Sequence, residues 1–235
     1  MKRRILVAGS AGFLGRHLCR LLTELGHEPV GLDIASDPHA PFLQVVGKAE
    51  DPQAWETAGE VSGVIHGAAL TDLWRPDRAD FINVNVGGTE QAARFSQERD
   101  LPLVHISSYT VCMAGDRTDP QVLRGEECFE PERLIGAYAQ SKRRAELALE
   151  AIRPQAIIIR PTAPIGPGDF RLTPPMRVVR DLAEGKLPGV MQGQINIVDV
   201  RDVADAVIAA FKLADSDGPN AAPRGRRYVV SGHDM

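Results

Sequence analysis

Residues 7–15, which read VAGSAGFLG, constrain the fold of this chain more than any other segment. They join a short apolar run to a segment with helical periodicity and contain Gly9, Gly12 and Gly15. In that setting the first glycine permits a tight turn, the second lets a pyrophosphate approach the backbone, and the third allows a helix to pack closely on a strand. The start of the helix would direct free N–H groups and its positive dipole end at the phosphates. The segment therefore predicts a dinucleotide-binding turn.

An acidic residue, Asp33, stands at the end of the second predicted strand. Its carboxylate can accept hydrogen bonds from a ribose 2′-hydroxyl and would repel a 2′-phosphate. No arginine follows it directly in the sequence DIASD. The pattern favours NAD over NADP.

Short apolar runs alternate with helical patterns along the first 160 residues. Because the runs lack a two-residue alternation, we expect helices on both faces of their sheet. The predicted strands are 5–8, 29–32, 42–46, 63–66, 103–106 and 156–159, and the predicted helices are 14–25, 79–98 and 137–151. This order predicts an α/β fold with a Rossmann-type doubly wound parallel sheet.

Proline and glycine accumulate after Arg160, in RPTAPIGPGDFRLTPP, where they can extend neither a helix nor a central strand. We therefore predict an NAD(P)-binding domain over 1–160 and substrate-lobe segments over 161–235. Within the second part we expect helices at 176–184 and 202–213 and strands at 195–198 and 227–230. Helix 202–213 and strand 227–230 can return to the main sheet.

Composition excludes several classes of protein. The 235 residues are 43% hydrophobic and 25% charged, which is typical of a soluble globular protein. The formal net charge of -4 gives no electrostatic footprint for nucleic acid or an anionic membrane, and no apolar run is long enough to span a bilayer. Three cysteines without a CxxC pair favour a reducing compartment, so we expect a cytoplasmic protein, and the six histidines show no metal-ligand spacing.

Tyr138 and Lys142 are four residues apart in the predicted helix that contains AYAQSKRRAE, so they share a face. A phenol beside an ammonium can donate a proton or be a plain surface pair. We expect the ammonium to lower the pKa of Tyr138, because a nearby positive charge favours the phenolate. Ser107 and Ser108 end a predicted strand at the carboxyl edge, where open α/β sheets bind ligands.

Five segments in this order resemble the extended short-chain dehydrogenases/reductases: GSAGFLG at 9–15, HGAA at 66–69, ISSYTV at 106–111, YAQSK at 138–142 and RPTAPIGPGD at 160–169. The resemblance covers essentially the whole chain. It is nearest to the branch with dihydroflavonol-reductase-like proteins, 3β-hydroxysteroid dehydrogenases and hopanoid-associated epimerase-like proteins. It implies that Tyr138 is the catalytic acid/base, that Lys142 binds the nicotinamide ribose, and that Ser108 polarises the substrate oxygen.

The resemblance also implies further residues along the cofactor. Besides the three glycines and Asp33, they are Phe13, Leu14, Lys48, Ala49, Ala68, Ala69 and Pro161. Lys48 departs from the family, which often has an aspartate there against the adenine. A lysine at this place reopens NADP as an alternative.

Other departures from the family's sequence pattern reduce the number of reactions that this chain could catalyse. Tyr109 and Thr110 stand where sugar-nucleotide dehydratases carry Asp-Glu and related decarboxylases carry a glutamate, so we exclude both reactions. Ala163 replaces an asparagine that many sugar-nucleotide epimerases use against the substrate diphosphate. Family members usually continue well beyond RRYVVSG, so we expect a small, truncated C-terminal substrate lobe.

Three functions are open at this point. The first is an NAD(P)-dependent oxidoreductase that transfers a hydride at a secondary alcohol/ketone centre of a small molecule. The second is an NAD-dependent sugar-nucleotide epimerase, and the third is a catalytically idle NAD(P)-sensing regulator. The resemblance further implies a homodimer packed through helices 79–98 and 137–151, with Arg143 and Arg144 at the interface. The substrate itself is left open.

Overall fold

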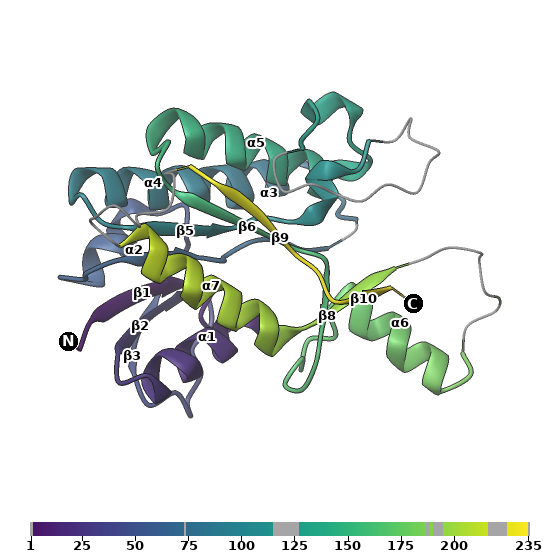
Figure 1. Ribbon diagram of the computed structural model, residues 1–235, viewed down its shortest axis with the longest axis horizontal. Coiled ribbons are helices and arrows are strands. Elements are labelled where there is room, and N and C mark those ends of the chain that lie inside the picture. The colour runs from purple at the N-terminus through teal and green to yellow at the C-terminus, as the bar shows by residue number, and fades with distance from the viewer. Residues whose placement is uncertain are drawn as a thin grey trace.

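The computed structural model describes residues 2–72, 74–114, 127–186, 189, 195–215 and 225–234. Its main element is a seven-stranded sheet in the order β3-β2-β1-β4-β5-β6-β9 (Figure 1). Every neighbouring pair in this sheet is parallel. The strands are β1 (Arg4–Ala8), β2 (Glu28–Asp33), β3 (Leu43–Val46), β4 (Val64–His66), β5 (Leu103–Ile106), β6 (Ile157–Pro161) and β9 (Arg227–Val230).

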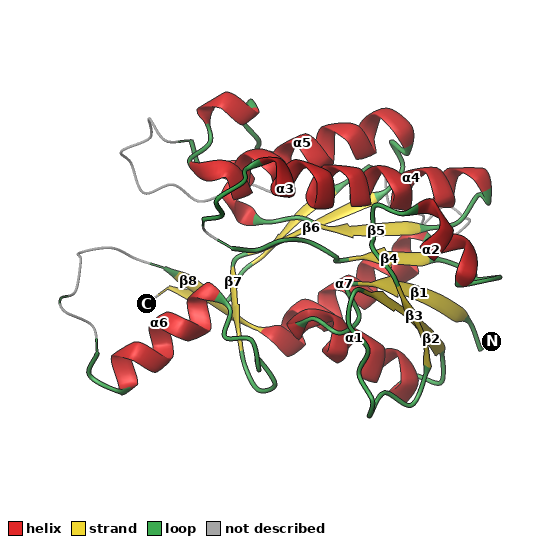
Figure 2. Cartoon of the chain, turned by 180° about the vertical axis from the view of Figure 1, so that it is seen from behind, coloured by secondary structure: helices red, strands yellow, loops and turns green. Residues whose placement is uncertain are grey.

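Helices cover both faces of the sheet (Figure 2). Ile5 and Val7 of β1 enter one core with α1 (Phe13–Glu24) and α7 (Val200–Ala214). Leu6 and Ala8 enter the other core, with residues of α2 (Pro52–Thr57), α4 (Gly88–Glu98) and α5 (Gly136–Ile152). Successive side chains of a strand point to opposite faces, so an uninterrupted apolar run fills both cores. The predicted doubly wound α/β fold is confirmed.

The strand order reverses beside β1, because β2 and β3 lie on one side of it and β4, β5 and β6 on the other. In an open parallel sheet, this switch point leaves a crevice outside the carboxyl ends of the strands. The glycine-rich turn follows β1 and Ser107 follows β5, so both predicted site segments lie at this edge.

The C-terminal part divides between two sheets. β7 (Ala163–Ile165), β8 (Asn196–Asp199) and β10 (His233–Asp234) form a second sheet in the order β10-β8-β7, near α6 (Pro174–Ala183). β9 lies in the main sheet beside β6, and α7 packs on the main core. The polypeptide after residue 160 thus contributes strands to both sheets.

Local structure differs from the prediction most clearly at 79–98, which we expected to be one helix. The structure has α3 (Ala79–Phe81), a π-helical segment η1 (Ile82–Gly87) and then α4. The wider turn carries Asn85, which is buried and bonds to groups outside its helix. π-Helical turns of this kind are frequent at functional sites. Helix α2 and strands β7 and β10 had no sequence-based prediction, because all three are short.

Two kinds of feature are absent from the described residues. None of their helices combines the length and apolar character that a bilayer span requires. The same residues contain no group of three or more His, Cys, Asp or Glu side chains arranged to hold a metal ion.

Candidate active site

The glycine-rich turn needs its glycines for different reasons. Gly9 has a φ of 87°, and a Cβ there would lie 2.7 Å from the amide nitrogen of Ala68. A Cβ on Gly15 would lie 2.0 Å from the carbonyl oxygen of Gly9, so only glycine lets α1 pack this closely. A Cβ on Gly12 would meet only that same oxygen, at 3.1 Å, so the remaining space beside Gly12 is open. The backbone there is accessible to a ligand next to the start of α1.

Asp33 is tied to this turn. Its Oδ2 accepts a hydrogen bond from the amide of Ala11 at 3.0 Å, and its Oδ1 accepts one from the amide of Ala35 at 3.2 Å. Each carboxylate oxygen keeps a second acceptor direction. The predicted ribose-binding residue is therefore fixed in orientation while still able to accept a ligand hydroxyl.

Ser108 follows β5 and is 7% exposed. Its Oγ accepts hydrogen bonds from the amide of Thr110 at 3.3 Å and from the Thr110 hydroxyl at 3.0 Å. With both acceptor directions used, the Ser108 proton is free to be donated. Its partner is Tyr138, because a side-chain hydrogen bond from Ser108 lowers the pKa of the tyrosine. The structure thus brings the two predicted residues together.

The pKa of Tyr138 corrects one expectation. Burial raises this pKa above its ordinary value, and the hydrogen bond with Ser108 opposes the rise only in part. Lys142 does not contribute to this shift, so the expected lowering by its ammonium is not seen, and desolvation of the phenolate raises the pKa. The phenol is therefore protonated at neutral pH.

Lys142 is 2% exposed, and its Nζ donates a hydrogen bond to the carbonyl oxygen of Ile106 at 2.7 Å. Burial lowers the pKa of Lys142 to about 8, although the carboxylate of Glu146 raises it. The ammonium is held against the end of β5, one helical turn after Tyr138.

Two histidines on neighbouring strands lie close to Lys142. His66 and His105 are paired in register, and their rings stack with centroids 5.3 Å apart. Burial lowers the pKa of His66 to about 3 and that of His105 well below its ordinary value, and the charge of Lys142 lowers both further. Both rings are neutral at physiological pH, so Lys142 is the charged group of this cluster.

Asn85 organises the site from the π-helical segment. Its Oδ1 accepts from the amide of Leu70 at 2.7 Å, and its Nδ2 donates to the Leu70 carbonyl at 3.2 Å and to Ser141 Oγ at 2.8 Å. The Ser141 hydroxyl in turn donates to the carbonyl of Tyr138 at 2.7 Å. Asn85 therefore links the segment after β4 to the turn of α5 that carries Tyr138.

The sequence does not reveal these contacts of Asn85, and it marks Thr110 only as a position without the carboxylate of dehydratases and decarboxylases. Asn85 could not have been identified, because its partners are 15 and 56 residues away. The bond from the Thr110 amide to Ser108 could have been predicted, since a serine hydroxyl often bonds the backbone two residues further along the chain.

The remaining predicted cofactor residues lie along the carboxyl edge. Phe13 and Leu14 open α1, Ala68 and Ala69 follow β4, and Pro161 ends β6. After β3, Lys48 is exposed and Ala49 is buried against the start of α4.

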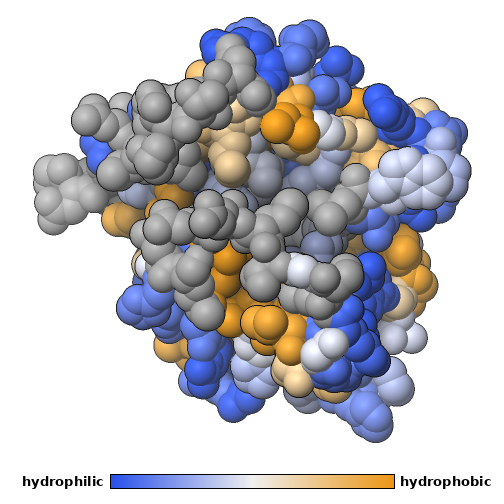
Figure 3. All heavy atoms as spheres, turned by 90° about the vertical axis from the view of Figure 1, so that its right-hand side faces the viewer, coloured by the Kyte–Doolittle hydropathy of each residue, from blue (hydrophilic) through white to orange (hydrophobic). Residues whose placement is uncertain are grey.

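Apolar side chains are exposed at the same end of the molecule. Figure 3 looks onto the right-hand side of Figure 1, and orange hydrophobic residues lie there among blue hydrophilic ones. Helix α6, which lies at this end in Figure 1, exposes Val178, Val179 and Leu182. The surface beyond the strand ends is thus partly apolar.

Arg143 was expected at a subunit interface, but its side chain is buried within the chain. It is 6% exposed and contacts Glu146 and Glu150 of its own helix at 3.3 and 3.6 Å. Its charge is needed inside the chain, beside a buried carboxylate, so it is unavailable to a subunit interface. Arg144 is exposed and pairs with Glu132.

Comparison with known proteins identifies the family of this chain. Residues 5–230 match the model of a family described as "NAD dependent epimerase/dehydratase family". A dihydroflavonol 4-reductase-like protein of Synechocystis sp. is 34% identical over 97% of this chain and 67% of the relative. A 2-alkyl-3-oxoalkanoate reductase of Stenotrophomonas maltophilia is 31% identical over 97% of this chain and 70% of the relative.

Among solved structures, gox2253 superimposes with a TM-score of 0.83 and 29% identity, covering 100% of this chain and 71% of that one. These similarities confirm the resemblance to the extended short-chain dehydrogenases/reductases and the prediction of an NAD-dependent enzyme of the oxidoreductase or epimerase type. The chain belongs to the NAD dependent epimerase/dehydratase family.

Proposed function

We propose that this chain is an NAD-dependent reductase or dehydrogenase that acts at a secondary alcohol/ketone centre of a small, largely apolar molecule. The observation that carries the proposal is the placement of Ser108 beside Tyr138 at the carboxyl edge, with Lys142 one turn further along α5 and bonded to the end of β5. Two relatives named as reductases, one of them of a 3-oxoalkanoate, support the same reaction class. The apolar surface at this end supports an apolar substrate.

The residues present fit NAD. Gly12 offers open backbone beside the start of α1, Asp33 presents a fixed carboxylate for a ribose hydroxyl, and Lys142 would hold the nicotinamide ribose. When bound, NAD supplies the hydride acceptor or, in its reduced form, the hydride donor. We further propose that Asp33 makes NAD the preferred dinucleotide, with NADP as the alternative that Lys48 leaves open.

Proton transfer is the task of Tyr138. Because burial keeps its phenol protonated at neutral pH, the side chain can give a proton to a substrate oxygen during ketone reduction. Ser108 would hold that oxygen where negative charge develops. Thr110 supports this role, because its two hydrogen bonds to Ser108 Oγ keep the serine hydroxyl as a donor, to Tyr138 in this structure and to the substrate oxygen in the proposed complex.

The proposal is tested by binding and turnover together. Calorimetry should detect NAD+ binding, and a panel of apolar ketones should oxidise added NADH, followed at 340 nm. Tyr138→Phe should lower turnover by about 100-fold or more while NAD+ affinity changes little. Turnover that survives in Tyr138→Phe would contradict the assigned proton donor.

A sugar-nucleotide epimerase is the competing function, and the same material distinguishes it. An epimerase reoxidises its own cofactor, so it should purify with bound NAD, need no added NADH, and interconvert sugar nucleotides without an absorbance change. Consumption of external NADH by a ketone substrate supports the reductase. An NAD-binding protein with neither activity would support the sensing regulator.

Assembly and location belong to the proposal as well. We propose a cytoplasmic homodimer packed through α4 and α5. The three cysteines are unpaired, which fits a reducing compartment, and Leu147 on α5 is 37% exposed. Sedimentation velocity tests the dimer, and Leu147→Arg should shift a dimer towards monomer.

A further inference from the structure

Arg16, near the start of α1, is held by three parts of the molecule. Its Nε donates a hydrogen bond to the carbonyl oxygen of Ala11 at 3.0 Å. Its Nη1 lies 3.3 Å from Oδ2 of Asp37, and its Cζ lies 5.4 Å from the centre of the Phe170 ring. The guanidinium is thus fixed beside the glycine-rich turn.

Asp37 occupies the loop after β2, and its position does not depend on Arg16. Its amide donates to Oε1 of Gln44 at 2.6 Å, and its carbonyl accepts from Nε2 of the same side chain at 2.7 Å. Its Oδ1 accepts from the amide of His39 at 3.0 Å, which leaves Oδ2 for Arg16. Hydrogen bonds with Gln44 and His39 therefore hold the Asp37 carboxylate in place beside the guanidinium.

Arg16 and Asp33 share one residue. Asp33 accepts from the amide nitrogen of Ala11, while Arg16 donates to the carbonyl oxygen of the same residue. Both side chains are thus anchored to Ala11 of the turn, and Asp33 is the carboxylate proposed to meet the ribose 2′ position. A free arginine in such a place is the usual partner of a 2′-phosphate, because its planar donors match phosphate oxygens.

We propose that Asp37 is a positioning residue for cofactor preference: by pairing with Arg16, it keeps this guanidinium from donating to the 2′-phosphate of NADP. Asp33 repels the phosphate directly, whereas Asp37 engages the Arg16 guanidinium beside the turn. The inference rests on the proposed function, since it concerns the dinucleotide bound at the same turn.

The test is a binding experiment on the full chain. Dissociation constants for NAD+ and NADP+ would be measured by calorimetry for the wild type, Asp37→Asn, Arg16→Gln and the double variant. Asp37→Asn keeps the acceptor for the His39 amide but removes the charge that pairs with Arg16. Asp37→Ser offers a second variant that can still accept from that amide, and thermal unfolding reports whether each variant is folded.

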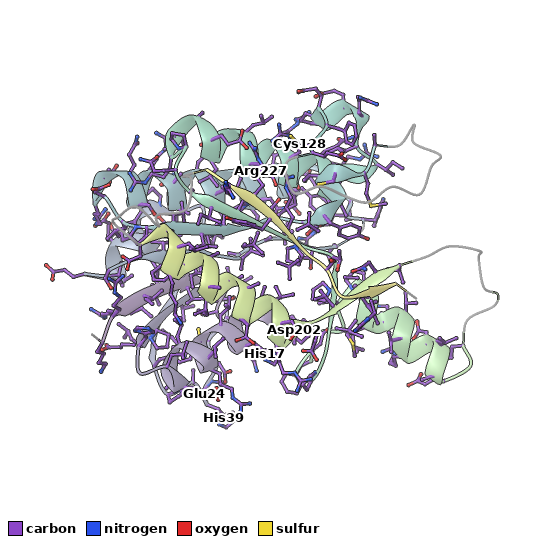
Figure 4. All side chains as sticks on the ribbon, in the orientation of Figure 1. His17, Glu24, His39, Cys128, Asp202 and Arg227 are labelled. Atoms are coloured by element: carbon purple, nitrogen blue, oxygen red, sulfur yellow. The ribbon has the colours of Figure 1, made fainter. Side chains whose placement is uncertain are left out.

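A matched control is available on the same helix. Glu24 pairs with Arg20 at 2.7 Å near the end of α1 (Figure 4), so Glu24→Gln makes the same change in net charge without releasing Arg16. Any general attraction of the more positive protein for NADP+ would appear in both variants.

We expect Asp37→Asn to tighten NADP+ binding about five- to tenfold and to change NAD+ binding less than about twofold. Arg16→Gln in the Asp37→Asn background should cancel the gain, and Glu24→Gln should give none. An unchanged affinity ratio in Asp37→Asn and Asp37→Ser, a gain that persists without Arg16, or an equal gain in Glu24→Gln would overturn the inference while leaving the proposed function intact. Wild-type protein that binds neither dinucleotide would overturn both.

Discussion

Arg160 and Glu146 form a bidentate ion pair in which both side chains are completely buried. Nε of the arginine lies 2.9 Å from Oε1 of the glutamate, and Nη2 lies 2.7 Å from Oε2. The pair joins the end of β6 to the middle of α5, the helix that carries Tyr138 and Lys142. It therefore fixes α5 against the carboxyl edge of the sheet.

Breaking the ion pair between Arg160 and Glu146 should lower the stability of the folded protein. Glu146→Gln would remove the buried carboxylate that pairs with both Arg160 and Arg143, and we expect a loss of about 3–5 kcal/mol in the free energy of unfolding. Urea denaturation measures it. Arg144→Gln on the same helix removes an exposed pair with Glu132 and should cost less than about 1 kcal/mol. Equal losses in the two variants would show that burial of the pair is not what matters.

Ser108 should control the titration of Tyr138. Because its hydrogen bond lowers the tyrosine pKa, Ser108→Ala should move that pKa further above its ordinary value. The difference in tyrosinate absorbance between each protein and its Tyr138→Phe counterpart isolates this residue from the other tyrosines. A downward shift in Ser108→Ala would mean that the serine accepts from the phenol instead of donating to it.

Lys142 should make stability depend on pH. Its pKa of about 8 in the folded chain is below the ordinary 10.5, so between these values only the unfolded chain binds the proton. At neutral pH the buried charge of Lys142 therefore lowers the free energy of unfolding, and this loss is recovered as the pH rises through that interval. Lys142→Met should stabilise the protein by roughly 1–3 kcal/mol at pH 7, and the difference should shrink towards pH 10.

Urea unfolding at several pH values measures the effect for Lys142→Met. Lys212→Met, at an exposed position on α7, is the control and should show no such trend. A stability difference that is constant with pH would contradict the burial of a charged Lys142.

Alanine substitutions at two glycines of the turn should have different effects, one on stability and the other on NAD+ binding. Gly15→Ala brings a Cβ to 2.0 Å from the Gly9 carbonyl oxygen, so it should lower the unfolding free energy by about 1–3 kcal/mol or more. Gly12→Ala meets that oxygen at 3.1 Å, so the fold should tolerate it better while NAD+ binding weakens. Thermal unfolding and calorimetry on both variants separate the two effects. Loss of folding in Gly12→Ala alone would reverse the assignment.

Several features of this protein were accessible from the sequence because they depend on residues close together in the chain. Apolar runs without alternation require a sheet covered on both faces, and that sheet is present. Gly9 needs a positive φ in a tight turn, and the turn between β1 and α1 has one. The family was likewise accessible, since its motifs are short and occur in a fixed order.

Other features were decided only by tertiary structure, because they depend on burial and on partners far apart in the chain. The family resemblance implied that Arg143 lies at a subunit interface, but the chain buries it beside the carboxylate of Glu146. The spacing of Tyr138 and Lys142 suggested a lowered tyrosine pKa, whereas desolvation raises it. The contacts of Asn85 with Leu70 and Ser141 exist only once β4, the π-helical segment and α5 are packed together. Residue spacing determines which groups can meet, but the surrounding packing determines how much water they keep and therefore which protonation state they hold.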